Sequence, residues 1–234
     1  MKISSRNTAE MTYIVDKLAR SASPKFAPAN PASPGKAPAK KTVLSTLRPP
    51  QAAGEVRIIG GLWKRTKLAV VNHPGLRPTP DRVRETLFNW LGQDMSGLRC
   101  VDAFAGTGAL GLEAASRGAL DVLLIESETR LINQLTSLKT KLKADAVRIQ
   151  RGDGIAILQA LPAGSVDVVF IDPPFEAPIF DKALAAAAHA VSSQGAVYLE
   201  APKLWTDAEL AVLGLAVTRS GKAGVVHYHL LSKI

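Results

Sequence analysis

The segment Asp172-Pro173-Pro174-Phe175 follows the apolar run 166–171 and combines a carboxylate, two prolines and an aromatic ring. An amine conjugated to a purine is a poor nucleophile, because its lone pair is delocalised. The Asp172 carboxylate and the Pro173 carbonyl could accept its two hydrogens from a loop that the prolines keep rigid. Phe175 could stack on the base. Asp-Pro-Pro can also simply end a strand, but here these four residues predict a catalytic loop for methyl transfer to an exocyclic amine.

A glycine-containing segment predicts the site of the methyl donor. It begins at Asp102, after another apolar run, and its glycines Gly106, Gly108 and Gly111 lead into a helical pattern. Glycine lets the backbone approach a ligand closely, although this spacing alone is a weak dinucleotide signal. A carboxylate at this strand end would repel a pyrophosphate but suits a ligand bearing an ammonium and a sulfonium. We therefore predict S-adenosylmethionine rather than NAD, bound by Asp102, Phe104, Gly106 and Gly108.

Two more acids follow the next two predicted strands. Glu126 comes 24 positions after Asp102, where a carboxylate can accept hydrogen bonds from both ribose hydroxyls. Asp153 follows residues 146–149 at the same sheet edge, where it could accept from an adenine amine or simply form a turn. We predict that both bind the cofactor. The leaving group of such a reaction is a neutral thioether, so no metal is predicted.

The elements that must position these residues alternate between strand and helix from residue 99 on. The predicted strands are residues 99–104, 122–126, 146–149, 166–171 and 196–200. This alternation predicts an α/β fold with a Rossmann-like, doubly wound, mostly parallel sheet and ligands at the carboxyl ends of its strands. Residues 215–219 and 225–231 flank a glycine-containing turn and predict a C-terminal antiparallel hairpin.

A second, shorter hairpin is predicted before this sheet. Residues 57–61 and 68–71 are typical of two short strands around a basic turn. A helix should follow, in which Thr79 is the N-cap, Pro80 takes the first position and Asp81 complements the positive helix end.

The sequence divides into three predicted parts. Residues 1–54 are rich in Pro, Ala, Ser and Lys and hold too few large apolar groups to offset the entropy of ordering. We predict that they form a disordered basic extension. Residues 55–95 would form the RNA-contacting hairpin and helix, and residues 96–234 the cofactor-binding domain.

The net charge of +9 is unevenly distributed, with +11 on residues 1–90 and −2 on residues 91–234. This asymmetry favours a polyanionic partner bound through the N-terminal part, although a basic tail can also be only a solvated face. The predicted RNA-contacting residues are Arg57, Lys64, Arg65, Lys67, Arg77, Arg82 and Arg84. Arg77 and Arg84 could instead reach the methionine carboxylate of the cofactor.

The remaining composition limits the class of protein. The single cysteine, Cys100, cannot form a disulfide within the chain or a zinc site by itself, and we predict it as a core residue in a reducing, cytoplasmic setting. No apolar run reaches the roughly 18 residues of a membrane span. We expect a monomer.

Several of these segments together resemble a known family, the bacterial 16S rRNA guanine-N2 methyltransferases called ribosomal small-subunit methyltransferase D. The matching segments are residues 57–61, 76–79, 81–91, the glycine loop with 112–114, and 172–175. The resemblance covers roughly residues 56–231, and segment 81–91 is its most specific part. Asp-Pro-Pro-Phe alone is shared with many amino-methyltransferases.

The resemblance implies a class I methyltransferase domain, S-adenosylmethionine as donor, and N2 of a guanine in 16S rRNA or a partly assembled small subunit as acceptor. By matching positions, Asp102, Gly106, Gly108 and Glu126 would bind the cofactor and residues 172–175 would form the catalytic loop. This chain departs from the family at Arg65-Thr66, where a glycine and a basic residue are usual. Residues 1–54 have no counterpart in compact family members.

Three other interpretations remain open at this stage. The catalytic loop would also serve an N6-adenine methyltransferase acting on DNA or RNA, although no separate target-recognition domain is visible. A non-catalytic RNA-binding protein with a vestigial cofactor pocket would not need intact acidic and glycine positions. An NAD-linked oxidoreductase is disfavoured by Asp102 and by the absence of a hydride-transfer constellation.

Overall fold

A computed structural model of the 234-residue chain describes residues 55–70, 79–175 and 179–234. The predicted disordered extension and Arg77 lie outside these residues. In the part described, no helix is both long and apolar enough to cross a membrane.

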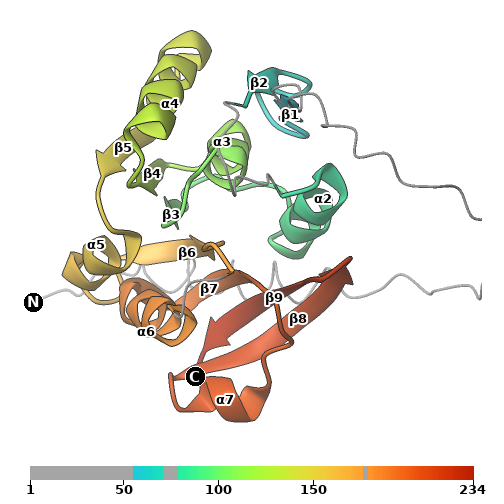
Figure 1. Cartoon of the computed structure of the whole chain (residues 1–234), viewed down its shortest axis with the longest axis vertical. Coiled ribbons are helices and arrows are strands. Elements are labelled where there is room, and N and C mark those ends of the chain that lie inside the picture. The colour runs from blue at the N-terminus through green and yellow to red at the C-terminus, as the bar shows by residue number, and fades with distance from the viewer. Residues whose placement is uncertain (1–54, 71–78, 176–178) are drawn as a thin grey trace, which may run out of the picture.

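The main sheet has seven strands in the order β5-β4-β3-β6-β7-β9-β8 (Figure 1). The strands are β3 Arg99–Asp102, β4 Asp121–Glu126, β5 Val147–Arg151, β6 Val166–Ile171, β7 Val191–Ala201, β8 Leu215–Ala223 and β9 Val226–Lys233. The first five pair in parallel, whereas β9 pairs antiparallel with β7 and with β8. The predicted mostly parallel, doubly wound sheet with a C-terminal antiparallel hairpin is therefore confirmed.

The two faces of the sheet carry different helices (Figure 1). The helices are α2 Asp81–Trp90, α3 Ala109–Ser116, α4 Thr129–Leu142, α5 Gly154–Ala160, α6 Phe180–Ala190 and α7 Asp207–Ala211. Apolar side chains of α2, α3 and α4 share one buried cluster, and those of α5, α6 and α7 share another. Because successive strand residues point to opposite faces, Phe170 enters the first cluster and Val169 the second.

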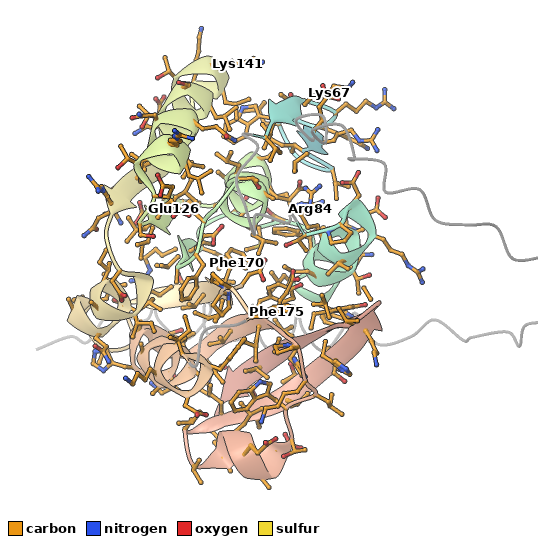
Figure 2. The ribbon with its side chains drawn as sticks, viewed as in Figure 1. Lys67, Arg84, Glu126, Lys141, Phe170 and Phe175 are labelled. Atoms are coloured by element: carbon orange, nitrogen blue, oxygen red, sulfur yellow. The ribbon has the colours of Figure 1, made fainter. Side chains whose placement is uncertain are left out.

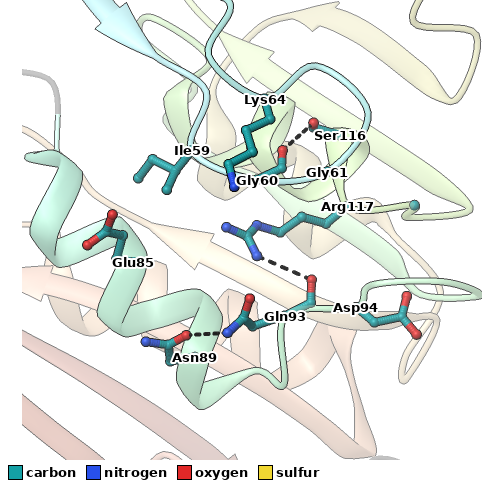
Figure 3. Close-up of a pocket in the computed structure, with 11 residues that line it drawn as sticks. Ile59, Gly60, Gly61, Lys64, Glu85, Asn89, Gln93, Asp94, Ser116 and Arg117 are labelled. Carbon is teal, nitrogen blue, oxygen red and sulfur yellow. Dashed lines mark hydrogen bonds between the residues drawn. The ribbon is translucent and has the colours of Figure 1, made fainter.

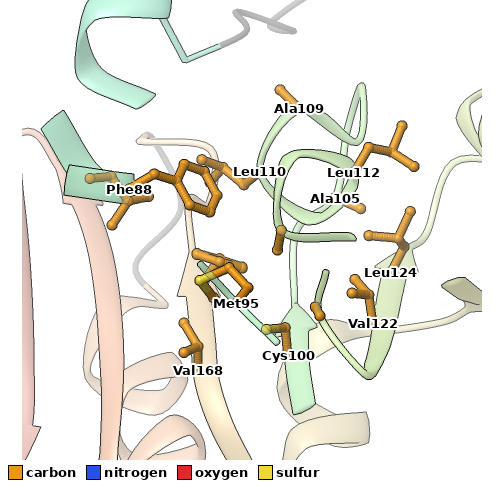
Figure 4. Close-up of a cluster of buried hydrophobic side chains, with 14 of the residues drawn as sticks. Phe88, Met95, Cys100, Ala105, Ala109, Leu110, Leu112, Val122, Leu124 and Val168 are labelled. Atoms are coloured by element: carbon orange, nitrogen blue, oxygen red, sulfur yellow. The ribbon is translucent and has the colours of Figure 1, made fainter. Parts of the chain in front are cut away.

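The face covered by α2 and α3 is also the face that carries the candidate site. Figure 4 shows Phe88 of α2 and Leu110 of α3 packed over Cys100 of β3 and Val168 of β6. Cys100 is only 1% exposed, as expected of a small core residue. Burial raises the pKa of its thiol, so this cysteine stays uncharged and packs like an apolar side chain.

The predicted N-terminal hairpin is present but its first strand lies earlier than expected. β1 Glu55–Arg57 pairs antiparallel with β2 Lys67–Ala69. Ile58 still bonds the opposite side of the hairpin, but residues 59–61 leave it because the amides of Ile59 and Gly60 each donate to the Glu113 carboxylate of α3, at 2.8 Å. A buried carboxylate thus replaces a strand partner, which the local sequence pattern does not reveal.

Glu113 also receives two arginines, and together these groups fix the hairpin and α2 on α3. Its Oε2 accepts from Nη1 of Arg84 at 3.3 Å, and its Oε1 accepts from Nε of Arg117 at 2.9 Å. Glu113 and Arg84 are both fully buried. We call Glu113, Arg84 and Arg117 the Glu113 cluster. Since each acid oxygen has donors, the cluster is a satisfied structural network.

Candidate active site

The predicted catalytic loop leaves the sheet at the carboxyl end of β6, the central strand. Pro173 is buried, Asp172 and Phe175 are half-buried, and Pro174 is exposed. The ring of Phe175 lies 6.4 Å, between centroids, from that of Phe180 at the start of α6. Figure 2 shows Phe175 below Phe170, next to the end of the central strands. The loop is thus anchored at Pro173 and Phe180, and part of the Phe175 ring stays accessible to a flat ligand.

Thr79 has a different role from the one predicted. Pro80, not Thr79, is the N-cap of α2, and no side chain caps this helix. The Thr79 hydroxyl is instead a donor to Oδ2 of Asp172, at 3.4 Å. Because Thr79 is only 5% exposed, its hydroxyl needs a partner inside the protein, and the catalytic loop supplies it. This bond ties the start of α2 to Asp172.

Three carboxyl groups meet around this loop, and we call Asp102, Asp172 and Glu200 the carboxyl cluster. Asp102 ends β3 and pairs in register with Phe170 of β6, two residues before Asp172. Glu200 of β7 comes directly after Leu199, the register partner of Ile171. Since side chains alternate along a strand, all three belong to the face covered by α2 and α3. Neighbouring strand ends therefore bring three acids together.

The surroundings of the carboxyl cluster disfavour the ionised forms of Asp102 and Asp172. Burial raises the pKa of Asp102 to about 7, against weaker opposing effects of the Gly111 and Phe104 amides. Burial, and then the nearby Glu200 and Asp102, raise the pKa of Asp172 well above its usual range, while the Thr79 hydrogen bond opposes this shift. A cation bound beside these groups would reverse both shifts. The site is therefore suited to a positively charged ligand.

Asp102 has acceptor capacity left for such a ligand. Its Oδ2 accepts from the Gly111 amide at 3.0 Å, but its Oδ1 is buried and has no hydrogen-bond partner among the described residues. A buried oxygen without a donor is costly, and an ammonium group would satisfy it. This unfilled acceptor fits the predicted S-adenosylmethionine.

The glycine loop after Asp102 has a backbone shape that would let a ligand approach it closely. Gly106 and Gly108 have φ angles of +51° and +78°, which favour glycine. A Cβ added to Gly108 would also lie 2.7 Å from a methyl carbon of Leu135. Phe104, between Asp102 and these glycines, is half-buried. The loop thus needs glycine at both positions to keep its path over the sheet edge.

Glu126, at the end of β4, holds the glycine loop. Its Oε2 accepts from the Gly106 amide at 2.9 Å, and its Oε1 accepts from the amides of Ser127 and Glu128 at 2.7 and 2.9 Å. These bonds fix the orientation of the carboxylate. A carboxylate oxygen can accept more than one hydrogen bond, so Oε2 can also receive a ribose hydroxyl.

Asp153 acts as a helix cap in this structure. It is exposed and is the N-cap of α5, where its Oδ1 accepts from the Ala156 amide at 2.8 Å. The turn-forming alternative therefore accounts for this residue. An additional contact of Asp153 with an adenine amine stays a prediction.

The predicted RNA-contacting residues divide into exposed and buried ones. The exposed ones are Arg57, Lys64, Arg65, Lys67 and Arg82. Arg57 and Lys67 pair with Asp81 and Glu55 at 3.1 and 2.8 Å, and such exposed pairs are weak enough to exchange for phosphate.

Arg84 is the one contradicted member of that set within the described segments. Its side chain is fully buried in the Glu113 cluster, and its Nη2 also bonds Oδ1 of Asp81 at 2.6 Å and the Arg57 carbonyl oxygen at 2.9 Å. A phosphate cannot reach it, and neither can a cofactor carboxylate. The prediction was wrong because a basic residue at helical spacing gives no sign of a distant buried acid.

A separate cavity of about 630 Å³ lies at the opposite end of α3 from the glycine loop (Figure 3). It is lined by the hairpin loop, the outer side of α2 and the end of α3, including Lys64, Asn89 and Arg117. The eight residues of α3 separate the cavity from the Gly108 end by about 12 Å. This cavity is therefore not part of the carboxyl cluster.

Two residues of the site have no functional role predicted from the sequence. The sequence predicts Thr79 as a helix cap and Glu200 only as the end of a strand. Glu200 does share a signal with Asp102, since each is an acid that ends an apolar strand. Among the residues that the structure describes, no group of three or more His, Cys, Asp and Glu side chains is arranged to hold a metal ion.

The sheet order and the site at the carboxyl ends of its strands define a class I methyltransferase fold. A solved precorrin-6y C5,15-methyltransferase from Geobacter metallireducens has a similar fold, with a TM-score of 0.53 over 66% of this chain and 88% of that chain, at 19% identity. The chain belongs to the family whose model is described as Conserved hypothetical protein 95, which matches residues 56–232.

Named relatives confirm the resemblance expected from the sequence. Ribosomal RNA small subunit methyltransferase D of Escherichia coli K12 is 45% identical over 132 residues, which are 56% of this chain and 66% of that protein. Its Haemophilus influenzae counterpart is 42% identical over 144 residues, covering 60% and 75%. The match to the Escherichia coli relative thus spans just under two thirds of its length.

A solved structure supports the same assignment. The solved structure of the Escherichia coli protein yhhF is 34% identical with a TM-score of 0.65, and the match covers 77% of this chain and 98% of that chain. The correspondence therefore extends over nearly the whole of that smaller protein.

Proposed function

We propose that this protein transfers a methyl group from S-adenosylmethionine to the exocyclic N2 amine of a guanine in 16S rRNA. The observation that carries the proposal is the meeting of Asp102 and Asp172 at the ends of adjacent strands β3 and β6. One acid suits a cationic donor and the other an amine acceptor. The relatives named for small-subunit rRNA methylation give the substrate class.

The cofactor would be held by groups of known position. Asp102 would accept from its ammonium through Oδ1, and Glu126 would accept from a ribose hydroxyl. Gly106 and Gly108 would let the backbone pass closely beneath it. When bound, S-adenosylmethionine supplies an electrophilic methyl group on a sulfonium. Its positive charge also lowers the cost of ionising Asp102 and Asp172.

The catalytic loop would make the acceptor amine nucleophilic. Asp172 and the Pro173 carbonyl accept its two hydrogens, and Phe175 stacks on the base and fixes the line of attack. After transfer the methylated nitrogen is positively charged and must lose a proton. The raised pKa of Asp172 suits it to accept that proton.

RNA would be bound by exposed cations of the hairpin and α2. Lys64 and Arg65 lie in the hairpin loop, and Arg82 lies on the first turn of α2, whose start is tied to Asp172 through Thr79. Phosphates held by these cations would position the RNA next to the start of α2, which is tied to the catalytic loop. The cytoplasmic setting and the monomeric state belong to this proposal as predictions.

Labelled methyl transfer tests this function. The purified chain is incubated with labelled donor and either 16S rRNA, partly assembled small subunits or duplex DNA, and the products are digested to nucleosides. We expect label in N2-methylguanosine from an RNA substrate and little label in DNA. Label appearing mainly in N6-methyladenine would contradict the guanine assignment and leave the donor site standing.

A further inference from the structure

We propose that Glu200 is the residue that selects guanine, by accepting the N1–H of the target base beside the reacting amine. This inference rests on the proposed function and names a specificity determinant of the same site. Glu200 is a carboxyl group on β7, only 4% exposed, in the strand next to the catalytic loop.

The position of Glu200 relative to Asp172 matches the edge of guanine. Adjacent strands lie about 4.8 Å apart, and Asp172 directly follows β6 while Glu200 is the next-to-last residue of β7, on the same face of the sheet. Guanine presents the N1–H and the N2 amine as neighbouring donors on its Watson–Crick edge. Two carboxylates side by side can therefore accept from both donors at once.

The order of the strands also gives the direction of the base. Glu126 on β4 and Asp102 on β3 mark the side of the methyl donor. Asp172 follows β6, and Glu200 lies on β7, the next strand beyond it. An amine at Asp172 that faces the donor has its ring extending away from β3. Of the two ring positions beside the amine, N1 and N3, the one on the β7 side lies next to Glu200, and a carboxylate there favours the N1–H.

Glu200 is held in a fixed orientation by its own strand. The hydroxyl of Tyr198, two residues earlier on the same face, donates to Oε1 of Glu200 at 2.9 Å. Tyr198 is fully buried and its ring stacks edge-on with Phe170 of β6. A carboxylate anchored in this way is positioned for recognition and cannot turn away to solvent.

The chemistry of a carboxylate at this place discriminates between bases. An ionised carboxylate only accepts hydrogen bonds, so it can pair with guanine N1–H. The N1 of adenine is itself an acceptor and would leave two acceptors facing each other. Two buried acceptors that face each other repel and cannot form a hydrogen bond, so the site would reject adenine and its analogues.

The test uses an RNA in which the target guanosine is replaced by 2,6-diaminopurine riboside, which keeps the C2 amine but has no hydrogen on N1. For the wild type we expect kcat/KM to favour guanosine by roughly 10²-fold. In Glu200→Gln the amide can donate to N1 of the analogue, so the preference should fall to about tenfold or less. Glu85→Gln, an exposed acid on α2, should keep the wild-type preference.

Two further measurements distinguish base recognition by Glu200 from a purely structural role of this residue. Glu200→Gln should bind S-adenosylmethionine as the wild type does, because Glu200 lies away from the donor side. Glu200→Asp keeps the carboxylate, so it should retain the preference for guanosine at a lower kcat/KM. If the glutamine variant does not fold, Glu200→Asp takes its place in the test. An unchanged preference in Glu200→Gln, with normal donor binding, would overturn the role of Glu200 alone. A wild type that makes no N2-methylguanosine would overturn the proposed function itself.

Discussion

Two buried clusters on the same face of the sheet, the Glu113 cluster and the carboxyl cluster, differ in how the charge of their acids is balanced. In the Glu113 cluster, both acid oxygens accept from backbone amides and from arginines. In the carboxyl cluster, acids gather around the catalytic loop, and Asp102 keeps a buried oxygen without a partner among the described residues. The Glu113 cluster therefore serves folding, whereas Asp102 in the carboxyl cluster keeps an acceptor for a ligand.

The largest expected effect is on stability, at the Glu113 cluster. Arg84→Met should lower the free energy of unfolding by about 3–5 kcal/mol, because it removes one of the two arginines that balance the buried Glu113 carboxylate. Denaturant unfolding measures the change. The matched control Arg82→Met, on the exposed side of the same helix, should change stability by less than about 0.5 kcal/mol. Equal effects of the two variants would contradict the structural role of Arg84.

The next largest effect is on rate, at the carboxyl cluster. Asp172→Ala should lower the single-turnover rate of methyl transfer by roughly 10²- to 10³-fold, because the amine then has one aligned acceptor fewer. Its affinity for S-adenosylmethionine should stay within a few-fold of the wild type. The exposed Asp145→Ala should change neither quantity. A near-normal single-turnover rate in Asp172→Ala would refute its role.

Donor binding should depend on pH through Asp102. Because the ionised form of Asp102 binds the ammonium and its pKa is about 7, affinity should rise roughly tenfold between about pH 5.5 and 7. Calorimetric titration at several pH values measures this, and Asp102→Asn should bind more weakly with a flatter pH profile. A flat profile in the wild type would remove Asp102 from the donor site.

Asp102 should also make the stability of the folded chain depend on pH. The folded chain keeps a proton on Asp102 that the unfolded chain has released above its ordinary pKa of 3.8. Without ligand, stability should therefore fall as pH rises from about 4 to about 7 and then level off. Asp102→Asn should weaken this fall, as thermal unfolding across the range would reveal.

The smallest expected effects concern the exposed cations. If Lys64, Arg65 and Arg82 each bind an RNA phosphate, replacing any one of them by Ala should lower the salt slope of RNA binding by roughly 0.7 to 0.9. Lys141→Ala, in the last turn of α4 and outside the predicted RNA-contacting set, should leave the slope unchanged. Equal slopes in all four variants would mean that the hairpin cations form only a solvated face.

The sheet and the catalytic loop could be predicted because their signals are local. An apolar run that ends in Asp102 and glycines, or in Asp172 and two prolines, indicates both the strand and the loop at its carboxyl end. Parallel topology then brings the strand ends to one edge, so separate motifs in the chain meet without further information.

The remaining features depend on partners that are far apart in the sequence. Arg84 and Glu113 are 29 positions apart, and Thr79 and Asp172 are 93 apart. A helical pattern marks Arg84 as basic but cannot tell that packing buries it against an acid. In the same way, Thr79 carries every local sign of a helix cap, yet its hydroxyl bonds the catalytic loop.

The central claim is most directly tested by mass mapping of modified nucleosides in small-subunit rRNA from cells with and without this protein. We expect one N2-methylguanosine to disappear when the protein is absent, to return with the wild-type chain, and to stay absent with Asp172→Ala. An rRNA whose N2-methylguanosine content is unchanged by removal of the protein, or is restored equally by Asp172→Ala, would contradict the account.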